Sequence, residues 1–298
     1  YQIAQKLYDL LSEAVQECIA TREVGSLLSG GIDSSAISVI ARHYIQNFHT
    51  FAAGVTSAPD LYYARQVAKY IGSIHHETTV SRQELITILP EVIYHLESFD
   101  PLLVRSSLTN YLVIRLAAEY VPAIFSGEGG DELFAGYDYL KTIPIEELQE
   151  ELYDITLRLH NTGLQRVDRC ASAFGLIAFT PFLNLDIVRF AFRIPPQYKL
   201  NNQEEKWILR CALENELPSQ VLHRKKAKFW QGTGVNELLA SYAEEKVSLS
   251  EFESGRVLPN GWKLHSREEY LYYKIFMDCF GELNNLDWMG RTKNYSEN

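Results

Sequence analysis

The chain has 298 residues, of which 46% are hydrophobic, and it carries a formal net charge of −10. This length and composition are typical of a globular protein with one large or two moderate domains. No apolar run is long enough to span a membrane, no signal-peptide pattern opens the chain, and an acidic chain without clustered Lys and Arg is disfavoured as a nucleic-acid or anionic-membrane binder.

The spacing of apolar residues predicts alternating helices and strands in the first half of the chain. In chain order these are a helix over 3–19, a strand over 24–29, a helix over 36–45, a strand over 48–55, a helix over 61–72, a strand over 75–80, helices over 82–96 and 110–120, and a strand over 123–127. Gly72 is expected to end the third helix, and the fourth contains Pro90. Strands separated by helices of this length imply a parallel sheet with right-handed crossovers.

Beyond about Thr142 the strand signal fades, and helices are predicted over 145–160, 204–217 and 267–280. The predicted fold class is therefore α/β, with a parallel twisted sheet flanked by helices and a second half that is helical. We divide the chain into an α/β core over 1–142 and a mainly helical half over 143–298 that packs on this core and completes the active site.

The stretch "EVGSLLSGGIDSSAISVIARHY" carries the first functional signal, where a strand gives way to a helix. Gly30 and Gly31 allow the backbone N–H groups at the helix start to approach phosphate oxygens, and the Ser29 and Ser34 hydroxyls add donors. Asp33 fits beside phosphate if Mg²⁺ bridges the two. The alternative is an ordinary strand-to-helix turn with a Ser/Asp cap. No Gly-Lys-Ser/Thr follows, so this is not a Walker loop. The ordered set S-G-G-x-D-S resembles the pyrophosphate-binding loop of the N-type ATP pyrophosphatases, which cleave ATP to AMP and pyrophosphate.

A second strand end carries an acidic cluster in "AIFSGEGGDELFAGYDYL". Ser126 and Gly127 end the strand, and Glu128, Asp131 and Glu132 follow. Because carboxyl ends of parallel strands meet at one edge of a sheet, this loop is expected beside the first one. A helix start that favours acids through its dipole is the alternative explanation, although it accounts for one acid and not for the whole group.

Together, "SGGIDSS", "SGEGGDELFAGY", "YHLESFD", "PFLNLDIVRFAFRIP" and "EEKWILRCALENELPSQVLHRKK" resemble the synthetase domain of glutamine-dependent asparagine synthetases, in the same order and over nearly the whole chain. The resemblance implies the ATP pyrophosphatase fold, also described as adenine nucleotide alpha hydrolase-like. It also implies that a carboxylate attacks the α-phosphorus of ATP, that pyrophosphate leaves, and that ammonia or an amine displaces AMP. Related β-lactam synthetases typically have Tyr at the position of Glu128.

The resemblance also assigns roles to individual residues. Ser29, Gly30, Gly31, Asp33 and Ser34 would hold pyrophosphate and Mg²⁺; Leu28 and Ala53 would frame the adenine; Ser126 and Gly127 would contact the nucleotide; Asp131 would be the second Mg²⁺ carboxylate; and Glu128 would orient or deprotonate the incoming nitrogen. ATP and Mg²⁺ are thus the expected cofactors.

Two further positions match the family's catalytic groups. Lys226, in "HRKKAKFWQGTG", corresponds to the lysine that stabilises the leaving pyrophosphate, and Arg224, Lys225 and Lys228 add positive potential nearby. A solvated basic turn is the alternative for this segment. Arg105, in "FDPLLVRSS", matches an arginine near the nucleotide and the acidic substrate.

The chain departs from the family around the substrate pocket. The family's G-x-E-x-R-V-P-F-L-D is "GLIAFTPFLN" here, so Ile177 replaces Glu and Phe179 replaces Arg. Leu102 and Leu103 replace a Thr pair, and Trp230 lies in the basic loop, where the family has F-S-D-G and this chain has "FWQG". A zwitterion would lose charge-assisted hydrogen bonds to such a pocket. An acid less polar than aspartate is therefore expected, with compensated drift around bound aspartate as the alternative.

The family's amino-terminal glutaminase domain is not part of this chain, and a separate glutaminase domain or subunit is one expected partner. β-Lactam or macrolactam formation by the same adenylation remains open, as does a non-catalytic nucleotide-binding homologue. A tRNA-modifying enzyme is disfavoured by the charge. A homodimer is left open. A cytoplasmic location with reduced thiols is expected because the cysteines are far apart and form no C-x-x-C pair: Cys18, Cys170, Cys211 and Cys279.

Overall fold

The computed structural model describes residues 1–20, 23–55, 58–224, 235–283 and 285–292. Its strands are β1 (Gly25–Leu27), β2 (His49–Gly54), β3 (Ile74–Thr79), β4 (Ala123–Phe125), β5 (Ile177–Phe179), β6 (Leu200–Asn201) and β7 (Glu204–Glu205). Its helices are α1 (Gln2–Ile19), α2 (Ile32–Arg42), α3 (Pro59–Ile71), α4 (Arg82–Leu96), α5 (Pro101–Ala117), α6 (Gly130–Leu133), α7 (Ile145–Leu157), α8 (Gly163–Ala173), α9 (Leu185–Ala191), α10 (Trp207–Ala212), α11 (Ser219–Leu222), α12 (Val235–Lys246), α13 (Leu249–Gly255) and α14 (Arg267–Phe280). Short 3₁₀ turns lie over 138–142, 158–161, 181–183 and 196–198.

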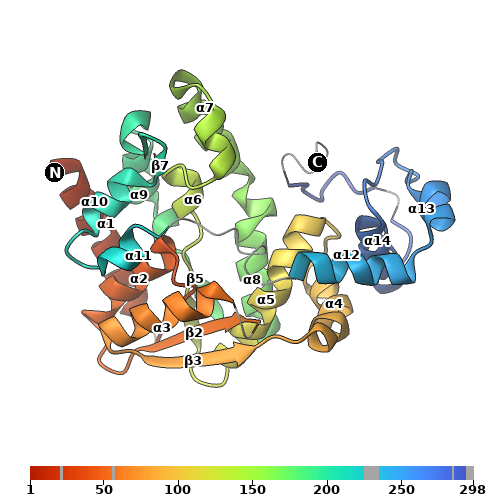
Figure 1. Ribbon diagram of the computed structural model, residues 1–298, viewed down its shortest axis with the longest axis horizontal. Coiled ribbons are helices and arrows are strands. Elements are labelled where there is room, and N and C mark those ends of the chain that lie inside the picture. Colours follow the sequence, from red (N-terminus) through yellow and green to blue (C-terminus); the bar gives the residue numbers. More distant parts are fainter. Residues whose placement is uncertain (21–22, 56–57, 225–234, 284, 293–298) are drawn as a thin grey trace.

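Five strands form one parallel sheet in the order β3-β2-β1-β4-β5, which confirms the predicted fold class. Alternate residues of its inner strands face opposite sides, as the two-residue period of a strand requires. On β4, Ala123 and Phe125 belong to one hydrophobic cluster and Ile124 to the other. Helices α1, α2, α3, α9, α10 and α11 contribute to the first cluster, and α4, α5, α8, α12 and α14 to the second (Figure 1).

The strand order reverses direction at β1, since β2 and β3 lie on one side of it and β4 and β5 on the other. A ligand crevice is expected at the carboxyl end of such a switch point. The loops that follow β1 and β4 leave the sheet there, and they are the two loops with the Ser-Gly signals. Register pairs Ser26 with Phe125, so the two loops start side by side.

Most predicted elements are confirmed, including the Gly72 cap with φ of 65° and Pro90 inside α4. The helix predicted over 110–120 begins earlier, at Pro101. Asp100 is its N-cap, and the side chain of Asp100 accepts a hydrogen bond from the Leu103 N–H at 3.0 Å. The apolar spacing is obscured in this first half because α5 is buried on several sides.

The helix predicted over 204–217 is wrong in its first part. Residues Glu204–Glu205 are β7, which pairs antiparallel with β6, and the helix covers only Trp207–Ala212. Asn202, Gln203 and Lys206 all have positive φ, at 48°, 68° and 57°. These left-handed residues form a tight hairpin turn and a bend that a continuous helix cannot contain.

The fifth strand of the sheet, β5, comes from the half of the chain beyond residue 142, where no strand was predicted. A three-residue strand is too short for its period to be recognised.

At the outer ends of the molecule, α12–α14 lie at one end of the long axis and α1, α9 and α10 at the other (Figure 1). In the part of the chain that the structure describes, no helix is both long and apolar enough to cross a membrane.

Candidate active site

The loops after β1 and β4 touch each other, and glycines permit the contact. A Cβ added to Gly127 would lie 2.9 Å from both the Asp33 Cβ and the Ser34 nitrogen. Gly30 has φ of 70°, and a Cβ there would lie 2.5 Å from the Cβ of Tyr63 on α3. Gly30 therefore holds the loop turned against α3 and does not itself line the cavity described next.

A cavity of about 570 Å³ opens over these two loops. Its volume is in the range of sites for small molecules and cofactors. Most residues predicted for nucleotide, metal or acid binding line it: Leu28, Ser29, Gly31, Asp33, Ser34, Ala53, Leu102, Leu103, Ser126, Gly127, Glu128 and Asp131. The structure thus brings together the two loops and the start of α5.

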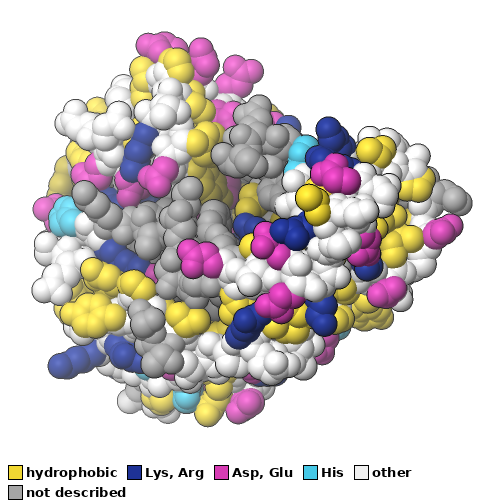
Figure 2. Space-filling view, turned by 45° about the vertical axis from the view of Figure 1, so that its right-hand side comes forward, with side chains coloured by type: hydrophobic (Ala, Val, Ile, Leu, Met, Phe, Trp, Pro, Cys, Tyr) yellow, Lys and Arg dark blue, Asp and Glu magenta, His cyan; other side chains and the backbone are white. Residues whose placement is uncertain are grey.

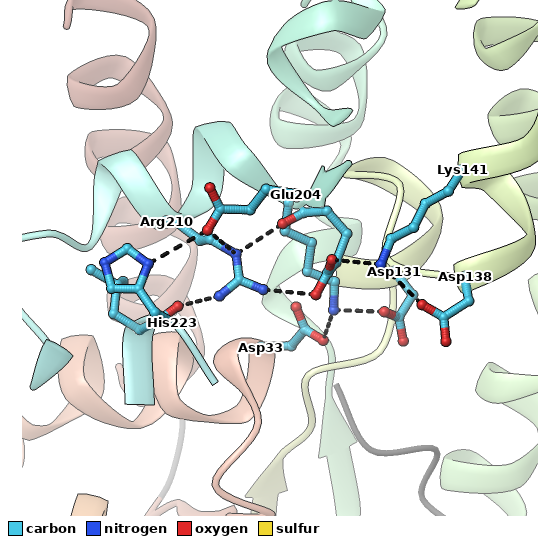
Figure 3. Close-up of polar contacts among 10 residues, drawn as sticks. Asp33, Asp131, Asp138, Lys141, Glu204, Arg210 and His223 are labelled. Carbon is cyan, nitrogen blue, oxygen red and sulfur yellow. Dashed lines mark hydrogen bonds and ion pairs between the residues drawn. The ribbon is translucent and has the colours of Figure 1, made fainter. Parts of the chain in front are cut away.

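Lys206 lies between the two acids predicted to bind metal. Its Nζ is 2.6 Å from Asp131 Oδ1 and also contacts Asp33 Oδ2, and its side chain is only 3% exposed. Figure 3 shows Asp33 and Asp131 facing a common point from their two loops. Burial alone would lower the pKa of Lys206, but the carboxylates of Asp131 and Asp33 outweigh it and raise this pKa above its ordinary value. Lys206 is a site residue that the sequence reasoning missed, because the segment 204–217 was predicted to be one continuous helix.

Lys206 is held in place by a surrounding ion-pair network. In β7, Glu205 pairs with Lys141 and with Arg210, each at 3.0 Å. In Figure 3, Arg210 lies on the left of this group of ion pairs and Lys141 on its right. The positive φ of Lys206 turns its side chain out of the hairpin, and the backbone N–H of Lys206 donates to the Phe134 carbonyl at 3.1 Å. The β6–β7 hairpin therefore places the Lys206 ammonium group where the loops after β1 and β4 meet.

The donor set suits Mg²⁺. Asp33 and Asp131 bring carboxylate oxygens from two loops to within contact of one cation, the Lys206 ammonium. Hard oxygen ligands of this kind are those that Mg²⁺ takes beside phosphate. The residues present therefore fit the metal that the nucleotide would bring.

Glu128 is bound by an arginine on the opposite wall. Arg166 of α8 donates from Nη2 to Glu128 Oε1, and both side chains are mostly buried, with exposures of 24% and 18%. Gly163, one turn earlier on α8, leaves room for the Glu128 carboxylate, since a Cβ there would collide with Oε2. Burial would lower the pKa of Arg166, but Glu128 raises it, so the arginine stays charged. The carboxylate is therefore held in a fixed position at the cavity wall.

A fourth carboxylate of the cavity, Glu132, accepts a hydrogen bond from the Tyr137 hydroxyl. Desolvation, with the charges of Asp131 and Glu128, raises the pKa of Glu132 to about 7. The cavity thus holds acids in distinct environments.

Of the basic loop over 223–234, the structure describes only His223 and Arg224. Arg224 contacts Asp60, donates to the Ser29 carbonyl at 3.2 Å, and stacks 4.1 Å from the Tyr63 ring. It joins the loop after β1 to α3 and lines the cavity. Lys226 and Trp230, predicted for catalysis and for the acid pocket, lie outside the described residues, as do Lys225 and Lys228.

Besides Gly30, three predicted site residues among the described ones do not line this cavity. Arg105 points to α14, where its Nε donates to Glu268 Oε1 at 2.6 Å. Ile177 is the first residue of β5, pairs with Ala123 at the beginning of β4 and is 39% exposed, so it lies at the end of the strand opposite to the site. Phe179 packs against the core cluster on one face of the sheet, with its ring 6.2 Å from that of Phe125. The catalytic role predicted for Arg105 and the substrate-pocket role predicted for Ile177 and Phe179 therefore stay predictions, and the lining of this cavity gives them no support.

Comparison with known proteins gives a family. The asparagine synthase family model matches residues 6–150 and 142–298. Asparagine synthetase B [glutamine-hydrolyzing] of Escherichia coli (strain K12) is 37% identical over 276 residues, which cover 86% of this chain and 50% of that protein. Asparagine synthetase [glutamine-hydrolyzing] 2 of Oryza sativa subsp. japonica is 35% identical over 299 residues, covering 91% of this chain and 50% of that protein.

The chain spans about half the length of the curated relatives it matches. Among solved structures, NMN synthetase from Francisella tularensis aligns over 96% of this chain and 97% of that one, with a TM-score of 0.36 and 13% identity. On the face shown in Figure 2, Lys and Arg side chains of the described residues are interspersed with Asp and Glu.

Proposed function

Because the chain belongs to the asparagine synthase family, we propose that it is an ATP-dependent, AMP-forming amide ligase. A carboxylate oxygen attacks the α-phosphorus of ATP, and the bond from that phosphorus to the bridging oxygen breaks, releasing pyrophosphate. The nitrogen of ammonia or an amine then attacks the acyl carbon, AMP leaves with the electrons of the carbon–oxygen bond, and the nitrogen loses a proton. The observation that carries this proposal is the meeting of Asp33 and Asp131, from two glycine-rich strand-end loops, in one cavity.

Each group has a role in this chemistry. The N–H groups and hydroxyls of the loop after β1 bind pyrophosphate, and Leu28 and Ala53 frame the adenine. Mg²⁺ held by Asp33 and Asp131 would neutralise charge on the phosphates, and Lys206 is a second, protein-borne cation beside the same two acids. Lys226 would stabilise the leaving pyrophosphate. Glu128, fixed by Arg166, orients the incoming nitrogen.

The acid is proposed to be less polar than aspartate. Leu102 and Leu103 line the cavity at the start of α5 and offer no hydrogen bond to an α-ammonium or α-carboxylate group. This support now rests on the two leucines, since Ile177 and Phe179 lie elsewhere. The two relatives are glutamine-hydrolysing by name, so a separate glutaminase domain or subunit is proposed as the source of ammonia.

The test is ATP–pyrophosphate exchange in the presence of MgCl₂, with aspartate, glutamate, butyrate, hexanoate and phenylacetate as separate acids. Exchange with at least one acid, and slower exchange with aspartate than with the best acid, is the expected result. Binding of ATP without exchange for any acid would instead indicate a nucleotide-binding homologue. Aspartate as the best acid would return the chain to asparagine synthesis.

A further inference from the structure

Residues 285–292, which we call the strap, follow the last helix and run back toward the cavity. Leu286 and Met289 are 5% and 4% exposed and belong to the hydrophobic cluster that also contains α4, α5 and α14. Gly290 packs so closely on Asn161, just before α8, that an added Cβ would collide with this side chain. The strap is therefore a packed part of the fold.

The end of the strap is fixed to two buried acids. Arg291 pairs with Glu269, which is 0% exposed, and its guanidinium lies 5.2 Å from the Trp262 ring. The Thr292 N–H and hydroxyl donate to the two carboxylate oxygens of Asp100, both at 2.8 Å. Asp100 is 1% exposed and caps α5, the helix that carries Leu102 and Leu103.

Thr292 lines the same cavity as the phosphate loops. The strap contacts both walls of this cavity, because Gly290 packs beside the start of α8 and Thr292 binds the start of α5. The residues that line the α8 wall include Thr162, Gly163 and Arg166. The strap thus crosses between the wall that holds Glu128 and the wall that presents the two leucines.

We propose that Thr292 is a specificity-determining residue, which closes the cavity beside Leu102 and Leu103 and limits the length of the acid's apolar body. Both donors of Thr292 are used by Asp100, so its methyl group and carbonyl remain for a ligand. A methyl group suits an alkyl tail, and neither remaining group donates to a second carboxylate such as that of aspartate. This inference rests on the proposed ligase function.

The experiment measures kcat/KM for ATP–pyrophosphate exchange with butyrate, hexanoate and octanoate. Thr292→Ala keeps the backbone bond to Asp100 and the Arg291 anchor, and opens space at the cavity wall. We expect it to raise the ratio of the longer to the shorter acid by about fourfold per methylene accommodated, with the KM for ATP unchanged. Thr292→Val loses the same hydroxyl bond to Asp100 as Thr292→Ala but keeps a branched side chain of similar size, so it should leave the ratio within about twofold of the parent. Thr87→Ala, at an exposed threonine of α4, is the matched control.

The possible outcomes distinguish the specificity role of Thr292 from the proposed ligase function. A shift in chain-length preference with Ala, and none with Val or in the control, supports the assignment of Thr292. Exchange by the parent with an unchanged ratio in Thr292→Ala overturns the inference and leaves the ligase function standing. The inference is also overturned if kcat/KM falls equally for all acids and the melting temperature falls in both Thr292 variants. No exchange by the parent with any acid overturns the proposed function and, with it, this inference.

Discussion

At the scale of single residues, Asp33 is the carboxylate whose role can be tested most directly. It lies on α2 just after the glycine loop and faces Asp131 across the Lys206 ammonium. Asp33→Asn keeps the shape and removes the charge that would hold Mg²⁺ against pyrophosphate. We expect ATP–pyrophosphate exchange with the best acid to fall by about 100-fold, with ATP binding by calorimetry changed far less.

Asp9→Asn, at an exposed position of α1, is the matched control and should exchange at the parent rate. An Asp33→Asn variant that exchanged ATP and pyrophosphate as fast as the parent would remove the metal role of Asp33. If ATP binding and the exchange rate fell together, Asp33 would instead be a residue that binds ATP in the ground state.

Lys206 leads to a second prediction at this scale. Replacing it with Met leaves Asp33 and Asp131 facing each other in a buried site without the cation between them. The loss of a buried ion-pair partner typically costs about 3–5 kcal/mol of unfolding free energy. MgCl₂ should restore part of this loss without any nucleotide, because the metal can occupy the position between the carboxylates. Urea unfolding of parent and variant with and without MgCl₂ measures both effects.

The double variant Lys206→Met, Asp33→Asn serves as the control, since one carboxylate is gone and the added stabilisation by MgCl₂ should disappear. Equal stabilisation of parent and Lys206→Met by MgCl₂ would contradict a shared position for the ammonium and the metal.

The sequence predicted the acids of the site better than their partners. Asp33, Glu128 and Asp131 follow strand ends with glycines, a local signal that needs no tertiary information. Lys206 and Arg166 come from the second half of the chain, and their partners are 173 and 38 residues away in sequence. No local spacing encodes such pairs, because the fold alone brings them together.

At the scale of elements, the same limit appears in the β6–β7 hairpin. Its strands have two residues each, and Asn202 and Gln203 connect them. Apolar periodicity extends a helix through this segment, since "EEKWILR" fits a helical pattern. The left-handed conformation of three residues, set by pairing of β7 with β6 and by the contacts of Lys206, overrides that local preference.

The hairpin provides the third prediction. Gln203 is exposed and has φ of 68°, a region in which residues with a Cβ are strained by about 1 kcal/mol. Gln203→Gly creates the Asn-Gly pair that two-residue hairpin turns favour. We expect the free energy of unfolding in urea to rise by about 0.5–1 kcal/mol. Gln83→Gly, in the first turn of α4, should lower it by a similar amount, and a destabilised Gln203→Gly would contradict the turn geometry.

At the scale of the whole molecule, alternating elements predicted a parallel sheet but not the order of its strands. The site depends on that order, because β1 and β4 must be neighbours for their loops to touch. Strand β5 and the α8 wall both come from beyond residue 142, so the second half supplies part of the sheet as well as part of the site. These are long-range arrangements, which single-sequence periodicity does not contain.

The stability of the whole fold should depend on one buried lysine away from the cavity. Lys199 is 0% exposed, its Nζ is 3.3 Å from Gln149 Oε1, and it lies 5.2 Å from the Phe192 ring. No carboxylate pairs with it among the described residues, in contrast to Lys206. Burial therefore lowers the pKa of Lys199 to about 7.

The fourth prediction follows from the sign of this shift. The unfolded chain binds the Lys199 proton up to its ordinary pKa near 10.5, whereas the folded protein releases it above about 7. The penalty of burying Lys199 is therefore complete below pH 7 and disappears as pH rises toward 10.5, at about 1.4 kcal/mol per pH unit. Lys199→Met should stabilise the protein most at pH 6, and its advantage over the parent should shrink at pH 8 and again at pH 9. Urea unfolding at these pH values, with Lys6→Met at an exposed position of α1 as the control, measures the difference. A difference between Lys199→Met and parent that stayed constant with pH would show that the lysine keeps its proton in the fold.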